Sequence, residues 1–204
     1  MTSQTRERCQ TRSTLYSPEK IVKRIKPTKK TGLQSRERLR QSFHPKKVRI
    51  LFVGESPPAS GRFFYQADSG LYRAIREAFV KAFPNLREAD FLKSFRRLGC
   101  YLLDLCARPV DRLHPKVRRK ACRAGEPRLA KSLQALRPEI VIVVIRSIAR
   151  NVKRAERKAN WSGRHVELPY PGRWIRHRTA FVRQLVPILR QSFPSQSDKV
   201  HVSH

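Results

Sequence analysis

Acidic residues are scarce in this sequence, and that scarcity is its most informative deficit. Of 204 residues only 15 are Asp or Glu, against 46 Lys or Arg, which gives a formal charge of +31 and a pI of about 11.4. A net charge of magnitude ~2 to 8 already keeps a small domain soluble. The excess therefore favours a polyanionic partner, and we expect DNA.

Long apolar runs and a dense cysteine framework are also missing. A membrane-spanning helix needs about 20 consecutive apolar residues, whereas the longest run here, Ile140 to Ile145, ends at Arg146. No apolar segment follows the first residues, so neither secretion nor a membrane partner is expected. The four cysteines are widely spread, as in a reduced intracellular protein. We expect a cytoplasmic monomer, associated with the nucleoid if its source is bacterial.

The composition changes twice along the chain. Residues 1–46 are rich in Ser, Thr, Lys and Arg and have almost no apolar periodicity, which predicts a flexible basic arm, although a transit peptide has a similar composition. Residues 47–193 alternate between apolar runs and helical patterns and are expected to form one domain. Residues 194–204 form a polar C-terminal tail.

Short apolar runs predict strands over residues 48–53, 101–105, 139–145 and 165–168. Helices are expected after Asp68 or Ser69, over 91–98, after the break at Gly125-Glu126-Pro127, from Ile148, and from Ile175, with Pro187 distorting the last one. Apolar strands separated by helices predict an α/β fold with a parallel sheet covered on both faces. Ligands of such sheets bind beyond the carboxyl ends of the strands.

The residues after the first predicted strand suit a site for a flat base. The segment Gly54-Glu55-Ser56-Pro57-Pro58 is followed by Gly61-Arg62-Phe63-Phe64. Glycine permits close backbone approach, the carboxylate can oppose a developing positive charge, and aromatic rings can stack on a base. An ordinary turn between strand and helix, with its aromatic residues in the core, is the alternative interpretation.

These motifs, in their order, resemble those of the uracil-DNA glycosylase superfamily over about residues 47–193. The resemblance lies in the two segments above, in Tyr101 to Pro109, in Leu136-Arg137-Pro138 before the third strand, and in Leu168 to Gly172. It implies a three-layer αβα fold with a central four-stranded parallel sheet. It also implies base excision repair, in which a damaged or deaminated base is flipped out of DNA and its N-glycosidic bond is hydrolysed.

The resemblance assigns roles to several residues but also shows departures. Phe64 matches the family's base-stacking aromatic residue, Gly54 at the end of the strand is expected to bind the base, and Glu55 matches the glutamate of a Gly-Glu-x-Pro subgroup. The family's water-activating Asp or Asn falls at Ser56. Its motif-final His falls at Leu168, next to Pro169 in the base-binding loop. Glu55 is therefore the carboxylate expected to stabilise a cationic sugar or orient water, while Ser56 can only position water.

Asp104 occupies the place of the asparagine with which the family reads the uracil edge. An ionised Asp only accepts hydrogen bonds, so it suits an exocyclic amine or a purine N–H better than the uracil O4. Capping of the adjacent loop by Asp104 is an equally compatible role.

Basic residues flank the predicted site and are expected to contact DNA phosphates. Trp174 falls in the region of the family's duplex-inserting loop, with packing in the core as the alternative. One subgroup of the family holds an iron–sulfur cluster on four cysteines; Cys106 and Cys122 resemble its second pair, but the first pair is missing. We therefore expect no metal and no cofactor. The expected DNA contacts are Arg62, Arg118, Arg119, Arg173, Trp174 and Arg176.

Two hypotheses follow for the function. The first is a DNA glycosylase acting on a flipped base. The second is a non-catalytic nucleic-acid-binding module that keeps the fold without the family's Asp and His. An RNA- or ribosome-associated basic protein is a weaker third.

Overall fold

The computed structural model describes residues 29–172 and 174–194. Its centre is a four-stranded, all-parallel sheet in the order β2-β1-β3-β4. The strands are β1 (Ile50–Gly54), β2 (Cys100–Asp104), β3 (Ile140–Val143) and β4 (Arg164–Glu167). Strands 1 to 3 are almost wholly buried, as expected for parallel strands covered on both faces. The predicted α/β fold and its four parallel strands are confirmed.

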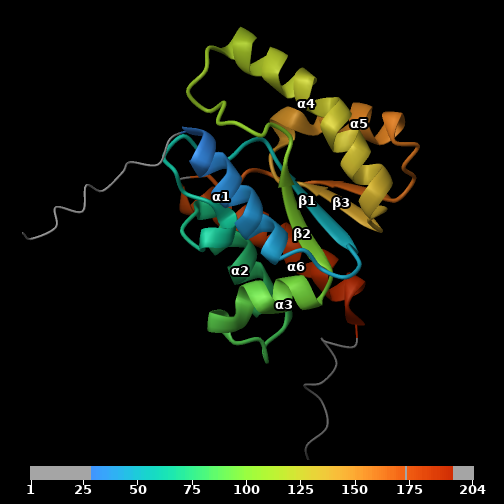
Figure 1. Ribbon diagram of the computed structural model, residues 1–204. Coiled ribbons are helices and arrows are strands. Elements are labelled where there is room, and N and C mark those ends of the chain that lie inside the picture. Colours follow the sequence, from blue (N-terminus) through green and yellow to red (C-terminus); the bar gives the residue numbers. More distant parts are fainter. Residues whose placement is uncertain (1–28, 173, 195–204) are drawn as a thin grey trace, which may run out of the picture.

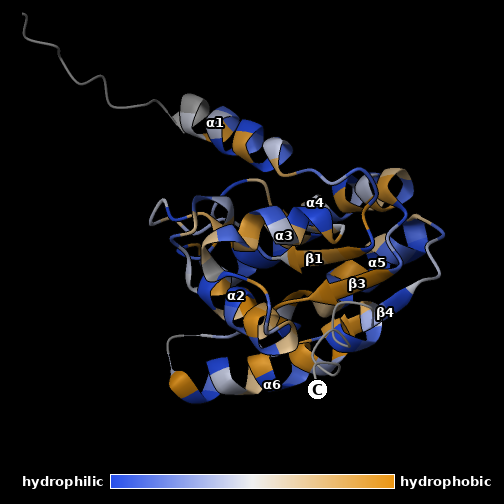
Figure 2. Cartoon of the chain, turned by 90° about the horizontal axis from the view of Figure 1, so that it is seen from below, coloured by the Kyte–Doolittle hydropathy of each residue, from blue (hydrophilic) through white to orange (hydrophobic). Residues whose placement is uncertain are grey.

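Helices cover both faces of the sheet (Figure 1). The helix α2 (Gly70–Ala82) packs against α6 (Ile175–Ser192), and α4 (Pro115–Leu136) packs against α5 (Ala149–Lys158). The short helix α3 (Phe91–Arg97) lies against β2. Figure 2 shows the apolar strands enclosed by helices whose outer faces are polar. The result is a three-layer αβα sandwich with its core between the sheet and the helices.

The helix α4 begins earlier than its sequence suggests. It starts at Pro115 and runs through Gly125-Glu126-Pro127, so the predicted break at these residues is wrong. A Cβ atom on Gly125 would lie 2.2 Å from the carbonyl oxygen of Leu105. The glycine is therefore a point of close contact between α4 and the chain leaving β2, and it does not end the helix. The other predicted helices are present, and the Ser69 hydroxyl caps α2 by accepting a hydrogen bond from Tyr72 N.

A helix, α1 (Lys29–Ser42), lies within the segment predicted to be a flexible arm. Few apolar contacts fix it: Leu39 and Phe43 pack against the core, and the Phe43 ring stacks on Tyr65 at 5.4 Å. Arg40 donates a hydrogen bond to the Tyr101 hydroxyl at 3.0 Å. The sequence did not predict this helix because the segment has little apolar periodicity, and arginines make most of its contacts with the rest of the fold. Residues 1–28 and the tail from 195 lie outside the described residues, so the domain boundaries stay a prediction.

No helix within 29–172 and 174–194 combines the length and the hydropathy needed to cross a membrane.

Candidate active site

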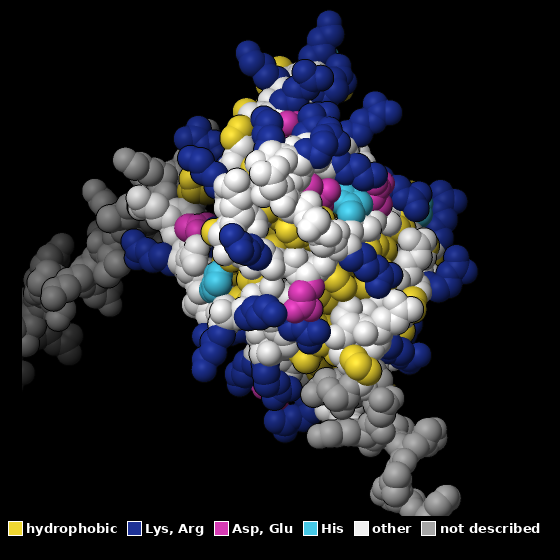
Figure 3. Space-filling view, turned by 90° about the vertical axis from the view of Figure 1, so that its right-hand side faces the viewer, with side chains coloured by type: hydrophobic (Ala, Val, Ile, Leu, Met, Phe, Trp, Pro, Cys, Tyr) yellow, Lys and Arg dark blue, Asp and Glu magenta, His cyan; other side chains and the backbone are white. Residues whose placement is uncertain are grey.

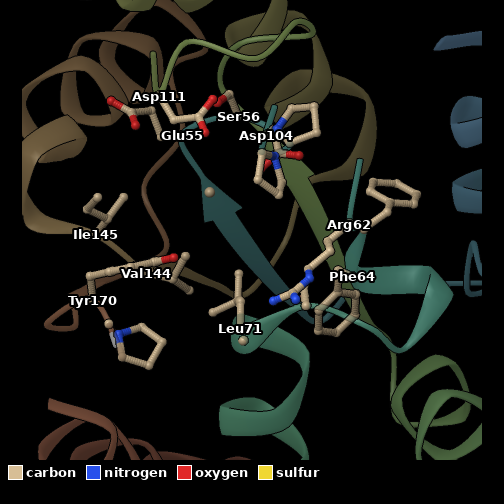
Figure 4. A pocket seen from close by; sticks show the side chains of 18 of the residues that line it. Glu55, Ser56, Arg62, Phe64, Leu71, Asp104, Asp111, Val144, Ile145 and Tyr170 are labelled. Carbon is tan, nitrogen blue, oxygen red and sulfur yellow. The ribbon is translucent and has the colours of Figure 1, made fainter. Parts of the chain in front are cut away.

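A pocket of about 740 Å³ opens at the carboxyl ends of β1, β2 and β3. Its walls come from the loop after β1, from the chain after β2, and from the loop before α6 (Figure 4). Parallel strands end at one edge of a sheet, which explains why segments far apart in sequence meet here. Eight of the predicted site residues line this pocket, namely Gly54, Glu55, Ser56, Arg62, Phe64, Asp104, Arg118 and Trp174.

Glu55 is held by Arg118, which the sequence placed separately as a DNA contact. Arg118 Nε donates to Glu55 Oε1 at 2.7 Å, and Arg118 Nη2 makes a second contact to Oε2. The Glu55 side chain is 11% exposed and that of Arg118 is 36% exposed. This hydrogen bonding raises the pKa of the Arg118 guanidinium. The carboxylate is thus fixed at the pocket wall and partly balanced by a cation.

Ser56 has a structural contact that bears on its predicted role. Its hydroxyl oxygen accepts a hydrogen bond from the Val110 backbone N–H at 3.2 Å, which ties the loop after β1 to the chain after β2. The hydroxyl proton is still available to a water molecule. Its assignment as a water-positioning group stays a prediction.

Asp111 is a pocket carboxylate that the sequence analysis missed. Both of its oxygens accept from the Ala59 backbone N–H, at 3.1 and 3.2 Å. In the described part of the chain Asp111 forms no ion pair, and its carboxyl group lies beside Glu55 at the pocket wall (Figure 4). A signal was present, since Asp111 follows the strand-exit motif in a chain with few acids.

Asp104 ends β2 and lies directly over Gly54. A Cβ atom on Gly54 would come within 2.4 Å of Asp104 Oδ1, so only glycine leaves room for this carboxyl group. Among the described residues none forms a hydrogen bond with the carboxyl oxygens, which argues against the loop-capping alternative. Burial raises the pKa of Asp104 to about 7, although the nearby Arg128 guanidinium opposes this shift.

This raised pKa predicts a pH-dependent effect of Asp104→Asn on stability. Because the folded state holds the proton up to about pH 7 and the unfolded chain loses it near its ordinary pKa of 3.8, ionisation opposes folding increasingly between these values. The cost above pH 7 is at most about 4 kcal/mol, reduced by the water that reaches the pocket. Asp104→Asn is therefore expected to gain stability over wild type from pH 4 to pH 7 and to keep that gain above it, as measured by urea unfolding at several pH values.

Glu167→Gln is the matched control for that series. The pKa of Glu167 is lowered by its hydrogen bond with Lys153, so its ionisation favours folding and its replacement is expected to cost stability as pH rises. A pH-independent difference between Asp104→Asn and wild type would contradict the assignment of a buried, protonated Asp104.

Phe64 is both a core residue and part of the pocket wall. It is 3% exposed and packs against Tyr65, with ring centroids 5.0 Å apart, and against Phe95 at 5.3 Å. It also lines the pocket, and its assignment as the base-stacking residue stays a prediction. The two interpretations offered by the sequence are therefore compatible with each other.

In the chain after β4, Tyr170 lines the pocket in place of the expected Leu168 and Pro169. Leu168 is 1% exposed, and its backbone N–H extends the ladder to Val143 O at 2.8 Å. Neither Leu168 nor Pro169 lines the pocket, whereas Tyr170 does, half-exposed and with its hydroxyl directed into the cavity (Figure 4). Burial raises the pKa of Tyr170, so the phenol stays protonated as a hydrogen-bond donor at neutral pH.

The predicted DNA contacts are distributed around the mouth of the pocket. Arg62 and Arg118 line it, whereas Arg119 and Arg176 are exposed outside it. Arg173 lies outside the described residues. Trp174 lines the pocket and is 63% exposed, so the alternative that it packs in the core is wrong.

The cysteines do not assemble a four-thiolate site in the part of the chain that is described. Cys106 Sγ and Cys122 Sγ lie 3.8 Å apart behind the pocket, but Cys100 is at the opposite end of β2 from Cys106. Across residues 29–172 and 174–194 no group of three or more His, Cys, Asp or Glu side chains is placed to hold a metal ion. The described residues thus do not fit the iron–sulfur cluster of the family's subgroup.

Residues 41–196 match the family model of the uracil DNA glycosylase superfamily, which covers well over half of the chain. A comparison with curated proteins gives no match.

Proposed function

The chain belongs to the uracil DNA glycosylase superfamily, and we propose that it binds DNA and hydrolyses the N-glycosidic bond of a flipped, damaged or deaminated base. The observation that carries this proposal is the pocket at the carboxyl edge of the sheet. It combines fixed carboxylates, an aromatic wall and a half-buried phenol within a strongly basic surface. A glycosylase-like function is supported at the level of the family, and the reaction on a particular base is our proposal.

Cleavage of an N-glycosidic bond places two charges in the pocket. The sugar becomes cationic and the departing base becomes anionic, so the protein needs an anion near the sugar and a donor near a base oxygen. Glu55 supplies the anion, and Arg118 holds its carboxylate in one orientation. Asp111 adds a second carboxylate, anchored by the Ala59 N–H, that can orient the attacking water together with Ser56.

Tyr170 supplies the donor that Leu168 cannot. Leucine has no polar hydrogen, and Leu168 is buried in the core. Tyr170 comes two residues later and directs its hydroxyl into the pocket (Figure 4). We therefore assign to Tyr170 the hydrogen bond to the leaving base oxygen, with Phe64 as the stacking surface for the base.

The class of base follows from the protonation of Asp104. Below its pKa of about 7 the carboxylic acid offers one donor and one acceptor, as an amide does, and suits a base edge with a carbonyl beside an N–H. Above that pKa the carboxylate only accepts, which favours an exocyclic amine. Wild type is therefore expected to change its relative rates on uracil and amine-bearing bases across pH 7. Asp104→Asn should act on uracil at both pH values, and an unchanged ratio in wild type would contradict this assignment.

The basic surface supports binding to the DNA backbone. The first turns of α4 project from the body of the fold (Figure 1), and Figure 3 shows Lys and Arg side chains gathered over this end. Exposed cations there include Arg112, Lys116, Arg119, Lys120 and Arg123, and no acid lies between residues 112 and 125. This arrangement suits a row of phosphates beside the pocket mouth.

We predict a strong dependence of DNA affinity on salt with little dependence on sequence. Each phosphate neutralised contributes about 0.9 to the slope of log affinity against log salt. Replacing both Lys116 and Lys120 by Ala should lower this slope by about 2. The control pair Lys131→Ala and Arg157→Ala, exposed elsewhere on α4 and α5, should leave it almost unchanged. Fluorescence anisotropy at several salt concentrations measures both, and a flat wild-type slope would exclude backbone-dominated binding.

One observation favours the non-catalytic alternative, namely the ion pair that offsets the charge of Glu55. The experiment that decides is base release from duplex and single-stranded DNA containing uracil, hypoxanthine, xanthine or methylated bases, followed by alkaline strand cleavage. Cleavage at one base supports the glycosylase. Tight binding with no cleavage of any substrate supports a binding module with the same fold.

A further inference from the structure

A second basic cavity lies at the opposite end of the sheet from the candidate active site. It has a volume of about 800 Å³ and an apolar floor that includes Phe43, Leu98 and Phe193. We call it the amino-edge groove because its walls include Arg49 and Gly99, which immediately precede β1 and β2. Its cationic lining residues are Lys46, Lys47, Arg49, Lys93, Arg96 and Arg97.

Acidic residues balance only part of this charge. Glu139 pairs with Lys47 and Arg49, at 3.1 Å in each case, and Asp90 pairs with Lys93 at 3.3 Å. Lys46, Arg96 and Arg97 form no ion pair with an acid whose side chain is described. The groove therefore keeps a net positive charge in a concave surface, where it attracts anions more strongly than isolated surface cations do.

Neutral acceptors hold several of these cations in place. Arg96 Nε donates to the His44 carbonyl oxygen at 3.1 Å, and Arg97 Nη2 donates to Ser94 Oγ at 3.3 Å. Arg49 Nη2 donates to the Ser192 carbonyl oxygen at 3.1 Å. A guanidinium oriented by a neutral oxygen keeps its full charge and its remaining N–H donors. Arg49 shares its charge with Glu139, whereas Arg96 and Arg97 are thus arranged for an external anion with paired oxygens, such as a phosphate.

We propose that the amino-edge groove binds the phosphate backbone of a second DNA duplex, so that one chain can bridge two DNA segments. The five residues of β1 separate its two edges by roughly 16 Å at about 3.3 Å per residue. The candidate active site and the groove open at opposite edges, so a straight duplex at one does not reach the other. The proposal does not depend on catalysis at the candidate active site.

A bridging assay with the full chain tests this proposal. One short duplex is immobilised, the protein is added, and capture of a second duplex with a different label is measured. Lys46→Glu with Arg97→Glu should lower this capture at least ~10-fold and reduce its log-log salt slope by about 2. Lys131→Glu with Arg157→Glu makes the same change in net charge on exposed positions of α4 and α5, and it should retain most of the capture.

The stoichiometry distinguishes bridging by one chain from bridging by self-association. Sedimentation of wild type with excess duplex should give two duplexes per chain, and the groove variant should give one. Equal loss in both double variants, unchanged capture in the groove variant, or one duplex per wild-type chain would each overturn the proposal. All four substituted residues are exposed, and the milder pair Lys46→Ala and Arg97→Gln replaces the groove variant if thermal unfolding shows that it does not fold.

Discussion

Glu55→Gln is expected to slow base release by at least ~100-fold while DNA affinity falls by no more than about twofold. Glutamine has the size of glutamate and can still accept a hydrogen bond from Arg118, but it lacks the negative charge that opposes a cationic sugar. The substitution also leaves Arg118 as an unbalanced cation near that sugar, which raises the barrier further. Single-turnover cleavage of the best substrate in the base panel measures the loss, and anisotropy measures the affinity.

The control for Glu55→Gln is Glu167→Gln. It removes the carboxylate of a β4 residue that pairs with Lys153 of α5 at 2.6 Å. Its rate of base release should equal that of wild type. If Glu55→Gln melts well below the control, the carboxylate serves the fold and its catalytic assignment is wrong. If instead Asp111→Asn loses the activity and Glu55→Gln keeps it, the anion beside the sugar is Asp111.

The sheet could be predicted from the sequence because its central strands are buried on both faces. A buried parallel strand has no polar face, so β1 and β3 appear as uninterrupted apolar runs. The start of α4 could not be found in this way. Gly125 indicated a helix break, but its lack of a side chain instead allows close contact with the Leu105 carbonyl oxygen. Only the packed fold shows that contact.

The candidate active site was only partly predictable. The rule that ligands bind at the carboxyl ends of strands brings Glu55 and Asp104 together without knowledge of any loop, whereas the place of Phe64 depends on the path of the loop after β1. The pairing of Glu55 with Arg118 joins residues 63 positions apart. Arg118 lies in the first turns of α4, which precede Gly125 and were not predicted to be helical. Tyr170 was missed because the comparison with the family motif directed attention to Leu168. Where an apolar residue such as Leu168 replaces the histidine of a family motif, a neighbouring polar side chain is a candidate for the hydrogen-bond donor.

Tyr170→Phe is expected to lower the rate of base release by about 10- to 100-fold, with little change in DNA affinity or stability. Phenylalanine keeps the ring that lines the pocket and removes only the hydroxyl to which we assign the hydrogen bond to the leaving base. The loss should be largest for bases that leave as poor anions and smaller for those that are already acidic, since the hydrogen bond matters most where more charge develops. Single-turnover rates for wild type and variant across the base panel test this gradient.

Tyr65→Phe is the matched control for the loss of a phenolic hydroxyl. The Tyr65 hydroxyl is buried against β2, where it donates to the Leu102 carbonyl oxygen at 3.2 Å and accepts from the Leu102 N–H at 2.8 Å. Its removal should cost stability by about 1 to 3 kcal/mol without changing how the rate depends on the base. A Tyr170→Phe variant that slows every base equally, or none, would show that the hydroxyl does not meet the charge on the leaving group. In that case no hydrogen-bond donor would replace the family's histidine, and base release would depend on the carboxylates beside the sugar.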